Sequence, residues 1–344
     1  MALTTCAFAA PTKGTPTTQP SFANIPIGYV AGFRNPSIQS SVGGQAICIS
    51  GTIDVTASAK NLQINYQEPA NSSEVTELCR DLPNQLNGLQ AARRQREEPR
   101  YTTFSYDRLG SGLSDHPDPI QTVQAPLQLE IAHELVQLLR TGGISNHTFE
   151  NVVGVGHSFG SFQVAGLLSQ YPDDFDAAVL TGFSTDRSGF AVAFAGVGLT
   201  IASQSQPLRF SDLSNGYFTS AAIQGTQHFF FRESNFDPAL LNIAEATKQT
   251  ITVGEFMTTG ALTPSPKFKG PIDVVIGEND LPNCHGNCLL PYNLAAAVKD
   301  ALYPAASNGS SWYLAPGTGH GLNFHYGAHM AYEHIHDFVK KNGF

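Results

Sequence analysis

The sequence is short of charge and of cysteine, and it contains no long uninterrupted hydrophobic run. Charged residues make up 14% of the 344 residues, against about a quarter in a typical soluble protein. The hydrophobic content of 41% is nevertheless close to that of globular proteins, while glycine (32) and proline (21) are ordinary. This composition excludes a disordered chain, a coiled coil and a collagen.

Basic residues are also scarce. Lys and Arg number 19 against 28 Asp and Glu, which gives a formal net charge of −9. A chain without a basic footprint is not expected to bind nucleic acid or anionic lipid. The best candidate for a membrane span, Ser188–Leu208, is uncharged but includes glutamines and glycines, so it is poorer than the ~20 apolar residues that a span requires.

Cysteine is too scarce for a disulfide scaffold, and no Cys-x-x-Cys spacing indicates a structural zinc site. The five positions are Cys6, Cys48, Cys79, Cys284 and Cys288. In an oxidising compartment, Cys284 is expected to close a small loop with Cys288, and Cys48 can pair with Cys79. Free thiols, or zinc bound together with His285, are the alternatives for Cys284 and Cys288.

Secretion is indicated by the first ten residues, MALTTCAFAA, whose Ala7-Phe8-Ala9 pattern is typical of a signal-peptidase site. They lack a basic start and a full apolar stretch, so we interpret them as the tail of a signal peptide. Asn-x-Ser/Thr acceptors for glycosylation occur at Asn71, Asn146 and Asn308. We therefore expect a secreted glycoprotein.

Composition divides the chain into four parts. The expected parts are a flexible tail (1–45), a region of strands and irregular structure (46–100), a core (101–183 and 266–344) and an insertion (184–265). Within the second part, Ala46–Val55 is typical of an edge strand. The charge-dense stretch Ala91–Arg100 is typical of a solvated helix end.

Short apolar strands alternate with amphipathic helices after residue 100. Strands are predicted at Tyr101–Tyr106, Asn151–Gly156, Ala177–Thr181, Ile272–Ile276 and Trp312–Leu314, and helices from Pro126, Ser158 and about Tyr326. The first helix repeats apolar residues at helical spacing and stops at Gly142-Gly143. Such alternation predicts an α/β fold with a mainly parallel sheet and helices on both faces.

A Gly-x-Ser-x-Gly pentapeptide, Gly156-His157-Ser158-Phe159-Gly160, lies between a predicted strand and a predicted helix. The turn leaves no room for a side chain at either glycine and imposes strained dihedral angles on the serine. This setting is typical of a nucleophile elbow, whereas an ordinary helix cap does not need both glycines. Ser158 is therefore the candidate nucleophile, and His157 is expected to pack beside it rather than act as a base.

A serine nucleophile requires an imidazole base and a carboxylate that orients the imidazole. Asp280 and His320 each follow a predicted strand, so they are expected at the same edge of the sheet. We expect the glycine-rich loop around His320 to swing its imidazole over that edge. Glu278 and Asp186 are alternative acids. The chain order Ser158, Asp280, His320 matches that of α/β-hydrolases.

Four stretches, YDRLGSGLSD, GVGHSFGS, GENDLP and PGTGHG, resemble signature motifs of the α/β-hydrolase superfamily. They are most similar to the fungal, often secreted, branch of its esterase-like family. The resemblance covers residues 101–344 and implies Ser158 as nucleophile, Asp280 as acid, His320 as base and the backbone N–H of Phe159 as an oxyanion donor. In the first stretch, Asp107-Arg108 is expected to anchor its loop by hydrogen bonds.

One feature of these hydrolases is missing. They usually carry a His-Gly pair after an early strand, and its loop N–H supplies the second oxyanion donor. The first histidine here is His116, so no such pair precedes the strand at Tyr101. Loss of one oxyanion donor typically costs ~10²–10³ in rate. Gly43-Gly44 or a turn near Gly88 is the alternative source of this N–H.

Ten of the 22 phenylalanines lie between Phe183 and Phe256, and they include Phe229-Phe230-Phe231. An aromatic-rich insertion between two core strands is typical of a helical cap over an active site, although aromatic residues also fill ordinary cores. We expect such a cap to favour a bulky apolar acyl or alcohol group.

These observations predict a serine hydrolase that cleaves a carboxylic ester of a bulky apolar small molecule through an acyl-enzyme, without a metal or organic cofactor. The alternatives are an impaired relative that only binds a small apolar ligand, and a lyase or acyltransferase on the same fold. Four histidines near the C-terminus are interpreted as a solvated helix face and not as a metal site: His325, His329, His334 and His336.

Overall fold

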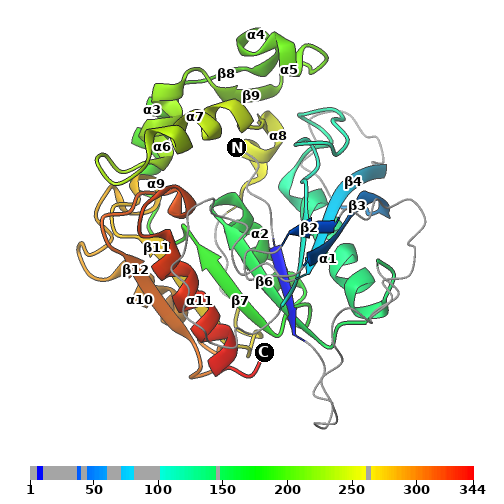
Figure 1. The fold of residues 1–344 in the computed structure, drawn as a ribbon, viewed down its shortest axis with the longest axis vertical. Helices are drawn as coiled ribbons and strands as arrows, with labels where there is room; N and C mark the ends of the chain where they lie inside the picture. Colours follow the sequence, from blue (N-terminus) through cyan, green and yellow to red (C-terminus); the bar gives the residue numbers. More distant parts are fainter. Residues whose placement is uncertain are drawn as a thin grey trace.

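A computed structural model describes residues 6–10, 37–39, 45–59, 71–80, 101–144, 148–260 and 265–344. The charged stretch 91–100, the glycines at 43, 44 and 88, and Asn146 lie outside these residues. The described chain forms a central sheet flanked by helices, with a smaller layer of helices and strands above one edge of the sheet (Figure 1).

The described part of the chain contains a nine-stranded central sheet. In spatial order its strands are β12 (Ser311–Ala315), β11 (Ile272–Gly277), β7 (Ala177–Thr181), β6 (Asn151–His157), β1 (Cys6–Ala10), β5 (Thr102–Tyr106), β4 (Asn71–Arg80), β3 (Gln45–Thr56) and β2 (Ser37–Gln39). Strands β3, β5, β6, β7, β11 and β12 run in one direction, and β1, β2 and β4 run in the other. The prediction of a mainly parallel sheet is therefore confirmed.

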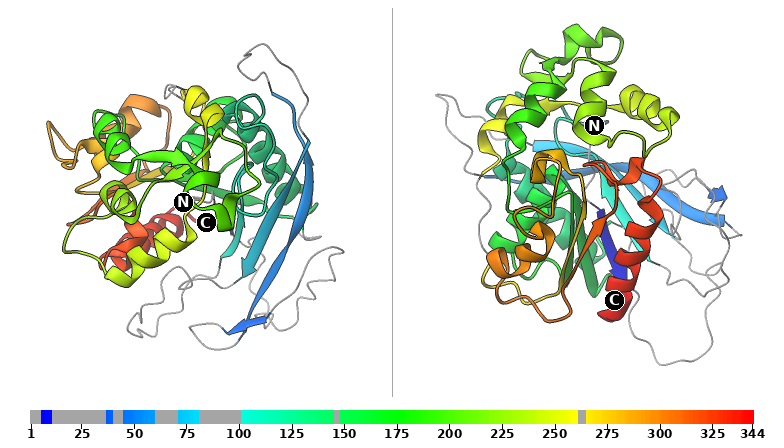
Figure 2. Two further views of the ribbon diagram at one scale, coloured as in Figure 1. Left: turned by 90° about the horizontal axis from the view of Figure 1, so that it is seen from above. Right: turned by 90° about the vertical axis from the view of Figure 1, so that its left-hand side faces the viewer.

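Helices cover both faces of the sheet, as predicted (Figure 2). Ala178 and Leu180 of β7 face the core that holds α1 (Ala125–Thr141), α2 (Phe159–Gln170) and α10 (Leu294–Leu302). Ala177 and Val179 face α11 (Ala328–Lys341) on the opposite side. Because successive strand residues point to opposite faces, this strand, which is apolar up to Thr181, is buried from both sides.

Helix α1 follows its sequence signals closely. Leu127, Ile131 and Leu135 lie on its buried face, and Pro126 stands in the first turn, where its missing N–H has no helical partner to lose. The helix ends at Gly142, whose φ of 82° is readily adopted only by a residue without a side chain.

The layer above the sheet is the cap, formed by residues 190–258 (Figure 1). Its elements are α3 (Phe190–Val197), β8 (Leu199–Ile201), α4 (Ala202–Ser205), α5 (Pro207–Phe210), β9 (Tyr217–Ser220), α6 (Ile223–Phe230), α7 (Pro238–Thr247), β10 (Ile251–Thr252) and α8 (Val253–Thr258). The predicted cap was helical, and the structure adds a three-stranded antiparallel sheet in the order β10-β9-β8. No helix of the described residues is long and apolar enough to cross a membrane.

Strand β1 occupies the position between β5 and β6, although residues 1–45 were expected to form a flexible tail. It pairs antiparallel with both neighbours, with Cys6 opposite Ser105 on one side and Val155 on the other. The pairing satisfies backbone groups that two central strands would otherwise leave open. This contact joins segments about a hundred or more residues apart in the chain, which local sequence patterns do not reveal.

The position of β1 is tested by Ala7→Pro. Proline removes a backbone N–H from a strand that is bonded on both sides, so a buried carbonyl loses its donor. We expect the free energy of unfolding, measured in urea, to fall by about 1–3 kcal/mol. Ser58→Pro, at an exposed position after β3, is the matched control. Equal unfolding midpoints for Ala7→Pro and the unaltered chain would place β1 elsewhere.

Candidate active site

Ser158 lies in a sharp turn between β6 and α2. Its φ of 53° and ψ of −115° form a strained conformation that few residues other than glycine adopt. A side chain at Gly156 would come within 2.4 Å of the Gly160 carbonyl, so strand and helix pack without space for one. The structure therefore builds the elbow as predicted, with the Ser158 hydroxyl projecting from the carboxyl edge of the sheet.

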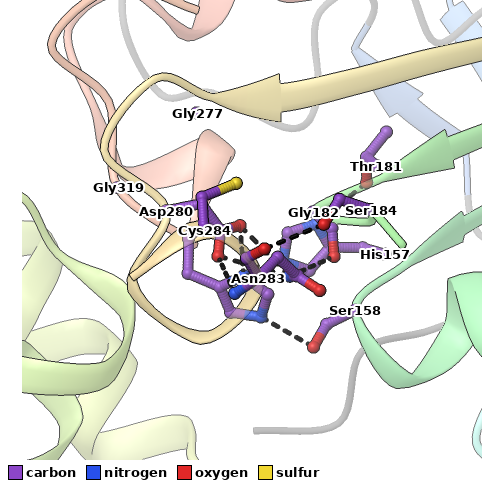
Figure 3. Close-up of polar contacts among 12 residues, drawn as sticks. His157, Ser158, Thr181, Gly182, Ser184, Gly277, Asp280, Asn283, Cys284 and Gly319 are labelled. Carbon is purple, nitrogen blue, oxygen red and sulfur yellow. Dashed lines mark hydrogen bonds and ion pairs between the residues drawn. The ribbon is translucent and has the colours of Figure 1, made fainter. Parts of the chain in front are cut away.

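Ser158, His320 and Asp280 are connected by two hydrogen bonds (Figure 3). The Ser158 hydroxyl donates to His320 Nε2 over 2.7 Å, and His320 Nδ1–H donates to Asp280 Oδ2 over 2.6 Å. Both His320 and Asp280 are buried, so this hydrogen-bonded pair is shielded from water. The three residues follow β6, β11 and β12, whose carboxyl ends share one edge because these strands run parallel.

The two alternative acids lie away from the imidazole. Glu278 accepts the backbone N–H of Gly317 over 3.1 Å, and Asp186 accepts the backbone N–H of Ser188 over 2.7 Å. Asp280 is therefore the carboxylate that His320 meets.

Asn283 holds the carboxylate of Asp280, and sequence reasoning did not identify it. Its backbone N–H donates to Asp280 Oδ1 over 2.8 Å, and its side-chain Nδ2 donates to the same oxygen over 3.2 Å. The Nδ2 group also donates to the carbonyl of Gly182, over 2.8 Å. Asp280 is the N-cap of α9 (Leu281–Cys284), and an Asp followed three residues later by Asn is the signal that could have revealed this contact.

A disulfide closes the loop directly after Asp280. Cys284 and Cys288 are both buried and bonded to each other, which sets aside zinc and free thiols at this place. Cys288 N–H donates to the carbonyl of Glu278, and Gly286 N–H donates to that of Asp280. The disulfide therefore restrains the segment that presents the acid. In the sheet, β3 and β4 place Cys48 and Cys79 at directly opposite positions.

His157 supports the site without contacting Ser158 Oγ. The Thr181 hydroxyl donates to the carbonyl of Gly156, so it accepts from His157 Nδ1–H, over 2.8 Å. Burial lowers the pKa of His157 well below its ordinary value, and the nearby His320 adds to the shift, since the two ring centroids are 5.1 Å apart. A neutral His157 does not oppose positive charge on His320.

The backbone N–H that was predicted as an oxyanion donor belongs to Phe159, at the start of α2. Phe159 is the first residue of α2, so its N–H has no partner within the helix and lies at the positive end of the helix dipole. The neighbouring strand β1 is antiparallel, so its carboxyl end lies at the opposite edge of the sheet. A loop that follows β1 therefore cannot supply the second oxyanion donor at this edge, and the described residues provide no such N–H.

Arg108 packs against the aromatic ring of Phe159. Its guanidinium lies 4.6 Å from the centre of the Phe159 ring, donates to Gln128 over 3.0 Å and forms a buried ion pair with Glu255 of α8. Asp107 accepts the N–H of Leu113 over 3.0 Å. The expected anchoring by Asp107-Arg108 is thus observed, and it also connects the core to the cap.

The histidines near the C-terminus do not form the expected solvated face. Helix α11 begins at Ala328, so His325 precedes it, and His325 is buried with hydrogen bonds to backbone groups. His334 bonds to the buried Asp273, and His336 stacks on Tyr101. His329 alone is exposed as expected.

The sequence matches the model of the alpha/beta hydrolase family over residues 79–331. The chain belongs to this family. Among curated proteins, no sequence matches it.

One solved structure of low sequence identity has a similar fold, and a second is more distantly similar. A thermophilic, malate-bound esterase from Thermogutta terrifontis is 14% identical, covers 85% of this chain and 99% of its own, and has a TM-score of 0.51. An alpha/beta hydrolase fold protein from Chitinophaga pinensis is 15% identical, covers 89% and 97%, and has a TM-score of 0.44.

In this α/β hydrolase, aromatic rings line one side of the His320 imidazole. The ring centres of Phe229 and Phe230 lie 5.4 Å and 5.7 Å from that of His320. From Phe229 the contacts continue to Phe194 and then to Phe190 and Phe256 of the cap. The cap thus places an apolar surface beside the Ser158–His320 pair.

The restraint on the acid loop is tested by Cys284→Ala/Cys288→Ala. Opening a loop this short is expected to lower the free energy of unfolding by about 2 kcal/mol, chiefly because the unfolded chain gains conformational freedom. Urea denaturation measures the change, and non-reducing peptide mapping of the unaltered chain checks the bond. If the bond is mapped in the unaltered chain but the double variant is equally stable, the disulfide does not stabilise the fold and the proposed restraint is contradicted.

Proposed function

We propose that this α/β hydrolase is a serine hydrolase that cleaves a carboxylic ester of a bulky apolar small molecule through an acyl-enzyme. The proposal depends on one observation: the uninterrupted hydrogen-bond relay from Ser158 through His320 to Asp280. Such a relay makes a serine hydroxyl nucleophilic at neutral pH.

In the proposed first step, His320 Nε2 accepts the hydroxyl proton while Ser158 Oγ bonds to the ester carbonyl carbon. Asp280 stabilises the imidazolium that forms, and the Phe159 N–H donates to the negative carbonyl oxygen. When the tetrahedral intermediate collapses, the ester C–O bond breaks and His320 returns its proton to the leaving alcohol. Water activated by His320 then releases the acid and restores Ser158.

The aromatic surface beside His320 supports the proposed substrate class. An apolar group that leaves water to pack against Phe229 and Phe230 gains the free energy of burying apolar surface, whereas a charged group would lose hydration there. A bulky apolar acyl or alcohol group therefore fits this side of the site better than a sugar.

We also propose an extracellular or otherwise oxidising location. The support is the Cys284–Cys288 disulfide, since such bonds persist where thiols are not kept reduced, together with the exposed glycosylation acceptor Asn308. The Ala7-Phe8-Ala9 pattern does not support this proposal, because these residues belong to strand β1 of the central sheet.

The nucleophile is tested by a fluorophosphonate probe followed by intact-protein mass measurement. We expect one adduct per chain and hydrolysis of p-nitrophenyl esters, with both lost in Ser158→Ala and the hydrolysis rate reduced by about 10⁴-fold or more in His320→Ala. Ser161→Ala, one turn further along α2, is the control for labelling. An unlabelled chain that still binds apolar esters would instead indicate a binding protein.

Selectivity for apolar groups is tested by Phe229→Ala. The ratio of kcat/KM for a p-nitrophenyl ester of an aromatic acid to that for the acetate is expected to fall on the order of 10-fold, because the larger group loses a wall that the acetate does not need. Leu208→Ala, at a fully exposed position on α5, is the control. An unchanged ratio would show that Phe229 does not contact the substrate.

A further inference from the structure

The loop that carries His320 is bonded to the cap and not only to the core. Gly321 N–H donates to the carbonyl of Phe230 over 2.7 Å. A side chain at Gly319 would come within 2.9 Å of the backbone nitrogen of Arg232 and within 3.1 Å of the backbone carbonyl oxygen of Phe230. The glycines on either side of His320 therefore let the cap backbone approach closely, while the loop holds the imidazole at the expected edge of the sheet.

His325 joins these segments through one buried imidazole, which is 2% exposed. Its Nδ1–H donates to the carbonyl of Gly321 over 2.8 Å. Its Nε2 accepts the N–H of Gly319 over 3.1 Å and the N–H of Arg232 over 2.8 Å. The same ring thus holds the residue before His320, the residue after it and the cap.

These three bonds require a neutral ring with its proton on Nδ1, since two N–H groups point at Nε2. Burial lowers the pKa of His325, which keeps the ring neutral at neutral pH. Without an acceptor at Nε2, the buried N–H of Gly319 and the half-buried N–H of Arg232 would lose their partner at once, and the loop would have to move to satisfy them.

We propose that His325 is a positioning residue that fixes the backbone on both sides of His320 and thereby sets the imidazole between Ser158 and Asp280. The inference rests on the proposed hydrolase function for its kinetic consequences. It also couples the catalytic base to the cap segment 230–232, so this part of the cap stays in place while His320 is aligned.

Substitutions at His325 separate its polar role from its volume. His325→Phe keeps a ring of similar size but removes all three hydrogen bonds. His325→Gln keeps an amide oxygen at the reach of Nε2, which can accept from Gly319 and Arg232. His329→Phe replaces the exposed histidine at the start of α11 and is the matched control.

The measurements are kcat and KM for a p-nitrophenyl ester, the melting temperature, and the far-downfield proton resonance of His320 Nδ1–H. In His325→Phe we expect kcat to fall on the order of 10- to 100-fold with KM within about 3-fold, because a small displacement of a catalytic group is costly. We expect the downfield resonance to broaden or disappear. His325→Gln should recover much of both, and His329→Phe should behave as the unaltered chain.

Two results would overturn the proposal. One is a folded His325→Phe that keeps kcat within about 2-fold and an unchanged downfield resonance. The other is an equal loss of kcat in His325→Phe and His325→Gln at equal melting temperatures, since the retained acceptor would then have no effect. If His325→Phe does not fold, His325→Asn, which lacks an acceptor at the reach of Nε2, takes its place.

Failure of the proposed function is recognised separately. An unaltered chain that neither hydrolyses esters nor reacts with a fluorophosphonate overturns that function. The downfield resonance then still decides the positioning role: its loss in His325→Phe supports the role, and its persistence contradicts it.

Discussion

The imidazole of His320 contacts Ser158 and Asp280 at the same time, and this double contact constrains the positions of three separate segments of the chain. Hydrogen bonds of 2.7 Å and 2.6 Å leave little tolerance for movement of any of the three segments. The parallel strands β6, β11 and β12 bring these segments to one edge. Hydrogen bonds and close packing within each turn then hold these three segments at that edge of the sheet.

The cap covers the site, and it also helps to hold the segments around Ser158 and His320 in position. Its hydrogen bonds and ion pairs with the core include the buried Arg108–Glu255 pair and the contacts of Phe230 and Arg232 with the loop of His320 and with His325. Arg108 also packs against the ring of Phe159, the residue that presents the proposed oxyanion donor. These two connections therefore join the cap to parts of the proposed catalytic machinery.

Local sequence patterns were sufficient for the elbow around Ser158 and for helix α1, because glycine spacing and apolar periodicity act over a few residues. The meeting of Ser158, Asp280 and His320 could be predicted because parallel strands end at a common edge. The role of His325 was missed because its partners are backbone groups, which leave no residue type to recognise. The contact of Asn283 with Asp280 was missed although the three-residue spacing of the two is visible in the sequence. Strand β1 was missed because both of its neighbours are distant in the chain.

The most direct test is a crystal structure of the chain after reaction with a phosphonate ester. We predict a covalent bond from phosphorus to Ser158 Oγ, a phosphonyl oxygen within hydrogen-bonding distance of the Phe159 N–H, and His320 still bonded to Asp280. Phosphorus attached to another residue, or a crystal that remains free of phosphonate after full exposure, would contradict the account.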